Sequence, residues 1–422
     1  MKKNAFTLVE LLAVIAILTI IMVISVPQLI TSLKNKKTDA LEKTKDLLIS
    51  AARNYVIDYE LKVPTSISIE TLCKNDYLEC PIKNPIDNSN LNGYVNVDDN
   101  KVYVYSDTRD YITIRDYIID LYNDESLRTS NGLKKDNTVD TNIRYYGSDP
   151  NNYVSFNNEL WRIIGVFGNN VKLVRSESLG SLSWDSSDSS INKGNGINQW
   201  GESTDVNGNT YLGANLQVYL NKMYYGGVET TCYNGADNSE TTCPTNTLDR
   251  TAKLLIDKHT WSLGAIEMSI EDTISFYNAE RGTANGKTCT SGTYCNDSVI
   301  RTTKWTGYVA LPYITDWAYA SSESICETNI QTKDSSNLFV CKNNNWMQRS
   351  AWTWYLSPGV QSANANYVWT VSGNGNVANY IMFGAMSKFA YYGSNVAPSI
   401  YLKSSVLMKG GSGTSSDPYK LA

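Results

Sequence analysis

A single carboxylate, that of Glu10, stands inside an otherwise almost entirely apolar run from Phe6 to Val26. About 20 apolar residues, each rising ~1.5 Å, cover the ~30 Å hydrocarbon core of a bilayer, so the run predicts a membrane-spanning helix. A charged side chain in such a helix costs about 2.5–3.5 kcal/mol at the bilayer centre. The chemistry expected of Glu10 is therefore ion pairing with a positive group within or beside the membrane.

The order of features around this run excludes an ordinary secretory signal. Such a signal carries its small-residue cleavage site after the apolar stretch, whereas here Lys2, Lys3 and the small residue Ala5 come before it. A plain N-terminal membrane anchor is the alternative. It explains the apolar run and the flanking lysines, but neither a carboxylate at the depth of Glu10 nor the order FTLVE.

The pattern AFTLVELLAVIAI resembles the leader and first helix of type IV pilins and pseudopilins over residues 2–27. The resemblance implies cleavage between Ala5 and Phe6 by a prepilin peptidase, N-methylation of Phe6, and pairing of Glu10 with the amino terminus of a neighbouring subunit. Pro27 matches the proline that kinks the family's helix. One position departs from the family pattern, because the family usually has Gly where this chain has Ala5.

Composition favours a folded extracellular protein. The chain of 422 residues is 42% hydrophobic and 19% charged, with 29 Tyr and 10 Trp, and its net charge is -5. A nucleic-acid binder usually presents a basic face, so DNA binding is disfavoured. A chain of 422 residues is long enough for two or three folded domains.

Eight cysteines fall into four pairs that are close in sequence. In an exported chain such pairs predict disulfides, and zinc is disfavoured because no C-x2-C motif occurs and His259 is the only histidine. The expected pairs are Cys73 with Cys80, Cys232 with Cys243, Cys289 with Cys295, and Cys326 with Cys341.

The chain is predicted to be an α+β protein with five parts. Helical spacing continues from Leu41 to Tyr59, and two short strands are expected at 94–97 and 102–105 around an Asp-Asp-Asn turn. A second helix is expected at 111–122. The predicted parts are a leader peptide (1–5), a transmembrane and filament-core helix (6–30), a pilin-like amphipathic helix with a small sheet (31–106), a helix and polar linker (107–142), and a larger β-rich, disulfide-stapled display domain (143–422).

The last of these parts resembles a domain appended to many surface and pilin-like proteins of Gram-positive bacteria. The resemblance is carried by PNNYVSFNNELWRIIGV, by WTWYLSP at 352–358, and by VAPSIYLK with the closing GTSSDPY. Related modules are similar to the C-type lectin and formylglycine-generating-enzyme fold. Related sequences usually carry Arg near Pro398, where this chain has Ala397 or Ser399.

Sites for small ligands are few in this sequence. A calcium loop of the helix-loop-helix type would need Gly at Thr210 and Glu at Leu216, so no calcium or other cofactor is expected. A looser calcium loop remains the alternative; its candidate ligands are Asp185, Asp188, Glu202, Asp205, Asn207 and Asn209. Aromatic rings can stack on sugars, although tryptophans are more often part of a core. The tryptophans with a candidate ligand-binding role are Trp305, Trp317, Trp352 and Trp354.

These observations predict a minor pilin or pseudopilin of a type IV pilus-like or type II secretion-like filament. Its expected partners are other pilin subunits, the prepilin peptidase, the assembly machinery, the membrane and an extracellular glycan or protein. The chain would span the membrane once and reach the cell surface after assembly. A membrane-tethered surface enzyme and a competence-type DNA-uptake pseudopilin are the alternatives, and an enzyme is disfavoured because no acid/base motif accompanies His259.

Overall fold

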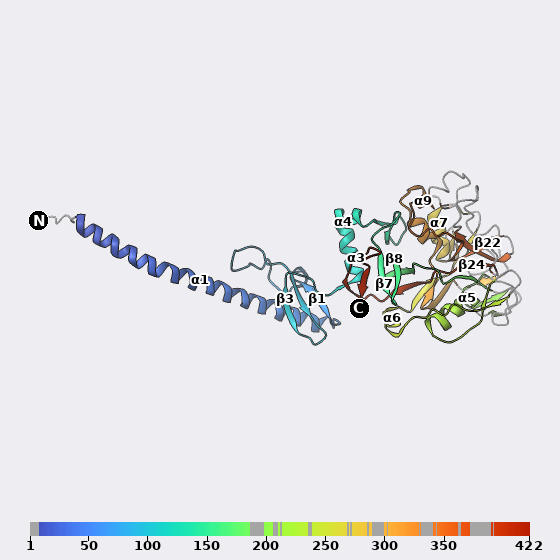
Figure 1. Cartoon of the computed structure of the whole chain (residues 1–422), viewed down its shortest axis with the longest axis horizontal. Helices are drawn as coiled ribbons and strands as arrows, with labels where there is room; N and C mark the ends of the chain where they lie inside the picture. Colours follow the sequence, from blue (N-terminus) through green and yellow to red (C-terminus); the bar gives the residue numbers. More distant parts are fainter. Residues whose placement is uncertain are drawn as a thin grey trace. The chain divides into compact units, whose positions relative to one another are not determined.

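A computed structural model describes most of the chain, which folds into two compact units, Met1–Ile112 and Thr113–Ala422 (Figure 1). The protein is of the mixed α+β class, as the sequence predicts. The backbone alone is described for residues 22–31, 203–205, 210–211, 267, 283–284, 287–288, 299–301, 360–361 and 364–366. The described residues are 8–185, 198–205, 210–211, 213–234, 239–267, 270, 272–284, 287–288, 299–301, 303–328, 330, 341–342, 344–361, 364–371, 390 and 392–422.

The first unit combines one long helix with a small antiparallel sheet. Helix α1 (Leu8–Asp58) has 51 residues and continues through Pro27. The sheet has the order β1 (Thr65–Ser68), β2 (Tyr94–Val97), β3 (Tyr103–Ser106). The predicted pairing of the last two strands is confirmed, with Val95 opposite Tyr105. The sequence analysis missed β1.

The amphipathic part of α1 packs under this sheet because its apolar residues recur at helical spacing. Short helix α2 (Ile69–Lys74) completes the layer. Its N-cap is Ser68, whose hydroxyl accepts a hydrogen bond from the amide of Thr71 at 2.9 Å. The buried core of the unit is formed by Leu48, Ala51, Ala52, Val56, Ile67, Ile69, Leu72, Leu78, Val95 and Val97.

The second unit is built around a sheet of ten strands with the order β21-β25-β9-β8-β7-β27-β26-β4, to which β6 adds on β8 and β5 on β6. Most pairs are antiparallel, but β27 lies parallel to β7. The strands are β4 (Ile112–Thr113), β5 (Leu133–Lys135), β6 (Ile143–Tyr145), β7 (Tyr153–Phe156), β8 (Glu159–Phe167), β9 (Asn170–Arg175), β21 (Val309–Ala310), β25 (Ser399–Leu402), β26 (Leu407–Gly410) and β27 (Tyr419–Leu421).

A second sheet in this unit has the order β10-β24-β22-β16, and β23 pairs with β22. Its strands are β10 (Ser181–Ser183), β16 (Ile266–Glu267), β22 (Thr353–Gln361), β23 (Asn364–Val371) and β24 (Gly393–Asn395). Shorter pairings involve β11 (Ser203–Asp205), β12 (Thr210–Tyr211), β13 (Cys232–Tyr233), β14 (Glu240–Thr241), β15 (His259–Ser262), β17 (Thr283–Ala284), β18 (Lys287–Thr288), β19 (Val299–Arg301) and β20 (Lys304–Gly307).

Short helices pack on these sheets and close one large apolar core. The helices are α3 (Ile114–Asn123), α4 (Glu125–Ser130), α5 (Asn215–Val218), the π-helical η1 (Tyr219–Tyr225), α6 (Arg250–Leu255), α7 (Thr273–Glu280), α8 (Ile314–Tyr319) and α9 (Ile325–Thr328). The core is rich in aromatic side chains, and its fully buried tryptophans are Trp161, Trp184, Trp200, Trp261, Trp317, Trp354 and Trp369.

The predicted polar linker at 123–142 is wrong, because this segment belongs to the second unit. It contains α4 and β5, and Leu133 is 2% exposed in the core. Its polar residues satisfy one another: the buried carboxylate of Asp136 accepts hydrogen bonds from Thr138 and Asn142. A polar sequence therefore forms an ordered, packed loop here, because its hydrogen-bonding groups find internal partners.

Candidate assembly interface

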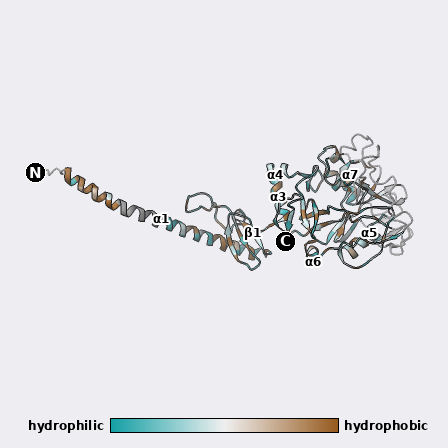
Figure 2. Ribbon diagram, viewed as in Figure 1, coloured by the Kyte–Doolittle hydropathy of each residue, from teal (hydrophilic) through white to brown (hydrophobic). Residues whose placement is uncertain are grey.

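The N-terminal half of α1 exposes a continuous apolar surface. The large apolar side chains from Leu8 to Ile21 have exposed fractions between 46% and 74%. In Figure 2 the ribbon of this end of α1 is coloured mostly as hydrophobic. Apolar surface on this scale is unstable in water and marks a surface that another apolar phase or partner covers. This stretch of α1 is therefore the candidate interface.

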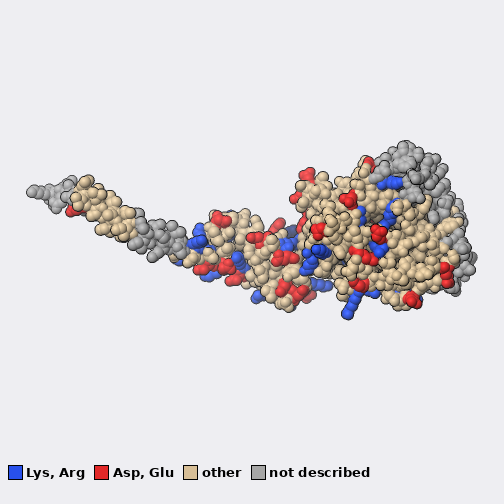
Figure 3. Space-filling model, in the orientation of Figure 1, with Lys and Arg blue, Asp and Glu red and all other residues tan. Residues whose placement is uncertain are grey.

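Glu10 lies in the first turn of α1 and is exposed. Figure 3 shows little other charge on the described part of this half of the helix, whereas the surface farther along α1 carries both signs. Ala5 and Phe6 lie outside the described residues, and for Pro27 the helical backbone alone is described. The predicted pairing of Glu10 with a freed amine thus stays a prediction.

Among the helices that the structure describes, none has a stretch that is long and apolar enough to cross a membrane.

The other half of α1 is held against its own sheet. Arg53 lies over the ring of Tyr103, with 5.1 Å from the guanidinium to the ring centroid. The ammonium group of Lys45 lies over the ring of Tyr105, 6.0 Å from its centroid. These contacts and the apolar core hold this half against the sheet, although single side chains such as Leu47 and Ile57 stay more than half exposed. The continuous exposed apolar surface is on the half that carries Glu10.

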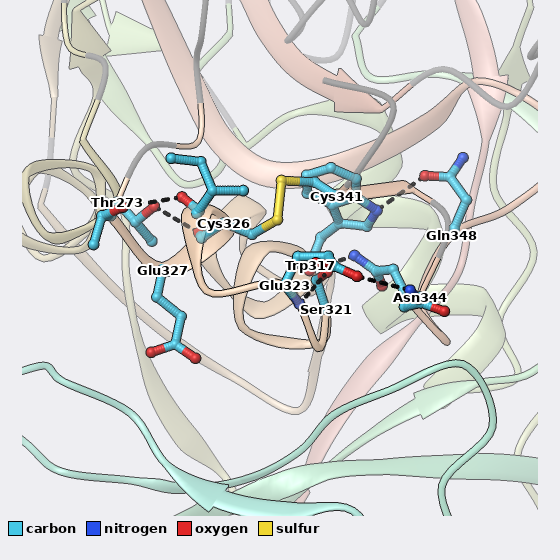
Figure 4. Close-up of a disulfide and its surroundings, with 12 residues drawn as sticks. Thr273, Trp317, Ser321, Glu323, Cys326, Glu327, Cys341, Asn344 and Gln348 are labelled. Atoms are coloured by element: carbon cyan, nitrogen blue, oxygen red, sulfur yellow. Dashed lines mark hydrogen bonds between the residues drawn. A yellow bond between two sulfur atoms is a disulfide. The ribbon is translucent and has the colours of Figure 1, made fainter. Parts of the chain in front are cut away.

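Three predicted disulfides are present: Cys73–Cys80, Cys232–Cys243 and Cys326–Cys341. Cys289 and Cys295 lie outside the described residues. Figure 4 shows the Cys326–Cys341 bridge beside α8 and α9, where the carbonyl of Cys326 accepts a hydrogen bond from the Thr273 hydroxyl at 2.9 Å. Both cysteines of this bridge are at most 2% exposed, so the bridge lies within the core of the second unit.

Two of the four candidate ligand-binding tryptophans are core residues. Trp317 and Trp354 are 0% exposed, so a sugar cannot stack on either ring, and the role predicted for them is wrong. The indole of Trp354 donates to the carbonyl of Leu182 at 2.8 Å. Trp305 and Trp352 are half-buried, and their binding role stays a prediction.

The candidate calcium ligands do not converge within the described chain. Asp188, Asn207 and Asn209 lie outside the described residues, and Asp185 is buried, where it accepts the amide of Asn215 at 3.1 Å. No group of three His, Cys, Asp or Glu side chains in the described parts is placed to hold a metal ion. Glu202 is exposed and belongs to no such group, and for Asp205 the backbone alone is described.

The histidine is packed rather than poised for proton transfer. The ring of His259 stacks on Tyr401 with 3.7 Å between centroids, and its Nδ1 lies 3.5 Å from Asp257. Burial lowers the pKa of His259, against the opposing effect of Asp257. These contacts place the imidazole within the β15 and β25 framework of the core.

The sequence analysis missed a pocket of about 240 Å³ in the second unit. Arg162 on β8 and Arg349, just before β22, line it together with Trp346. The two arginines are 187 positions apart and follow no local motif, so no spacing signal in the sequence brings them together.

Comparison with known proteins identifies the N-terminal segment. Residues 1–26 match the family model of the prokaryotic N-terminal methylation motif. No curated protein and no solved structure matches the chain. The matched residues contain Ala5, Phe6 and Glu10 and include the exposed apolar stretch of α1 from Leu8 to Ile21. The chain thus carries an N-terminal segment of the type IV pilin or pseudopilin type.

Proposed function

We propose that this protein is a minor pilin or pseudopilin of a type IV pilus-like or type II secretion-like filament, with the second unit displayed outside the cell. The observation that carries the proposal is the exposed apolar half of α1 with Glu10 in its first turn. An apolar helix of this kind is stable in a bilayer before assembly and among the same helices of other subunits afterwards.

Glu10 would direct the assembly. Cleavage after Ala5 by a prepilin peptidase leaves the amine of Phe6 at the start of the helix. That amine, on an incoming or neighbouring subunit, supplies the positive group that a carboxylate in apolar surroundings requires. One ion pair would then set the depth at which each subunit enters the filament.

The size of the second unit supports a minor, displaying subunit. Residues 113–422 have their own core and at least two disulfides, and so form a large body attached to a small pilin-like unit. Major subunits repeat at close spacing along a filament, which a body of this size would obstruct. We assign this unit a binding rather than a catalytic role, toward an extracellular glycan or protein.

The test is the variant Glu10→Ala in cells that assemble the filament. The variant is expected to remain in the membrane fraction, because the apolar run is intact, and to be absent from sheared filaments, because the amine loses its partner. Glu229→Ala is the matched control, since it removes an exposed carboxylate from a loop of the second unit. Normal recovery of the Glu10→Ala variant in filaments would contradict the proposal.

A further inference from the structure

Two arginines, Arg162 and Arg349, line the pocket in the second unit. Arg162 is 9% exposed and donates from Nε to Asn152 at 2.7 Å and from Nη2 to Asp149 at 2.9 Å. Its guanidinium lies over the Tyr153 and Trp346 rings, 4.0 and 4.7 Å from their centroids. These contacts fix the group in one position, and within the described chain its Nη1 has no hydrogen-bond partner.

Arg349 is a cation without a carboxylate partner among the described residues. Its Nη1 and Nη2 atoms donate to the backbone carbonyls of Ser176 and Arg175 at 2.6 and 2.7 Å. Burial lowers the pKa of Arg349 and the pKa of Arg162. The positive charge of Arg349 lowers the pKa of Arg162 further. Arg162 has the carboxylate of Asp149 as its partner, whereas Arg349 has none among the described residues. Because buried charges in proteins are normally paired, an anion in the pocket would stabilise Arg349 and could also accept from the free Nη1 of Arg162.

Hydroxyl groups complete the lining. The side-chain oxygen of Ser176 is buried and has no hydrogen-bond partner among the described residues, although it belongs to the pocket wall. Exposed Ser415, from the loop between β26 and β27, and the carboxylate of Glu177 stand at the rim. Serine hydroxyls both donate to and accept from other hydroxyls, and a carboxylate accepts from them, so the wall suits a polyol better than an apolar ligand.

We propose that this pocket binds an acidic monosaccharide unit of the uronic acid class, with Arg349 and Arg162 on the carboxylate and with Ser176, Ser415 and Glu177 on the sugar hydroxyls. Guanidinium groups bind planar carboxylates through paired hydrogen bonds. A volume of about 240 Å³ admits one sugar ring and not a longer segment. The inference deepens the proposed display function by naming the ligand class of the second unit.

The test is calorimetric titration of the full chain in detergent with D-glucuronate and with D-glucose, which differ only in the carboxylate. Glucuronate is expected to bind at least tenfold more tightly. Arg349→Gln should weaken glucuronate binding at least tenfold, whereas Arg250→Gln, a change at an exposed arginine of α6, should leave it unchanged.

A second variant guards against misfolding of Arg349→Gln. Ser415→Trp fills the pocket from an exposed loop position and should also abolish glucuronate binding. Equal affinity for both sugars, absence of glucuronate binding, or unchanged binding by both pocket variants would overturn the inference. Binding of N-acetylglycine in place of glucuronate would overturn it in favour of a peptide carboxylate. Since none of these titrations involves assembly, their failure leaves the Glu10 test unaffected.

Discussion

The ammonium group of Lys172 on β9 lies 2.5 Å from the Oδ2 atom of Asp316 on α8, and both side chains are at most 1% exposed. Asp316 also accepts from Arg144 at 2.7 Å, and Arg144 in turn donates to Asp136 at 2.6 Å. Cations and anions therefore alternate through the interior of the second unit. The ring of Tyr313 lies 4.2 Å from the Lys172 ammonium group, so the pair is shielded from water.

Removing Lys172 should destabilise the second unit. Lys172→Met leaves part of the Asp316 charge buried without its partner, which costs about 3–5 kcal/mol. The measurement is urea unfolding of the full chain in detergent, followed by tryptophan fluorescence. Lys420→Ala, at an exposed position of β27, is the control and should change stability by less than about 0.5 kcal/mol. A Lys172→Met variant as stable as the wild type would show that the pair contributes nothing.

Glu280 should make the stability depend on pH. Burial raises its pKa to about 7, from 4.5, although hydrogen bonds from Thr315 and the charge of Arg281 oppose the shift. The folded state therefore favours the protonated acid. Its stabilising effect is complete below pH 4.5 and is lost as the pH rises to about 7.

The variant Glu280→Gln removes this titration. The stability of the variant relative to the wild type should increase by about 3 kcal/mol between pH 4.5 and 7.5, because each pKa unit corresponds to about 1.36 kcal/mol. Urea unfolding at several pH values measures the difference in free energy of unfolding between the variant and the wild type. His259 titrates in both proteins, so its contribution cancels in this difference. Glu229→Gln should show no such trend. A pH-independent difference between Glu280→Gln and the wild type would refute the prediction.

The Cys326–Cys341 bridge should stabilise the second unit through its closed loop. The two cysteines are separated by 15 positions, and the chain-entropy estimate for a loop of that length is about 3 kcal/mol. In the double variant Cys326→Ser/Cys341→Ser, the free energy of unfolding of the second unit, measured in urea, should fall by about this amount. The double variant Cys73→Ser/Cys80→Ser serves as the comparison, since its bridge lies in the first unit and its loss should leave the unfolding of the second unit unchanged.

Trp317 should act in stability and not in ligand binding. Its indole is fully buried and donates to Gln348 at 3.2 Å, so Trp317→Ala should cost about 3–5 kcal/mol through the cavity it leaves. Trp352 is half-buried, so Trp352→Ala should lower the free energy of unfolding by less. Thermal unfolding of both variants in detergent tests this order, and the reverse order would contradict the assignment of Trp317 to the core.

Local features were predictable because neighbouring residues encode them. The apolar run with Glu10, the helical spacing that continues to Tyr59 and the hairpin at residues 94–106 all depend on short-range periodicity or turn residues. The three observed disulfides also join cysteines that are close in sequence, where few alternative partners compete.

Only the tertiary structure decided which distant residues meet. Arg162 and Arg349 line one pocket, and Lys172 pairs with Asp316, although neither pair shares a motif or a spacing. The segment 123–142 is polar in sequence yet packed in the fold, because Asp136 finds internal partners. Such contacts depend on how sheets and helices pack as a whole. The sequence by itself therefore determined the apolar N-terminal helix, and the packing of the second unit determined its pocket.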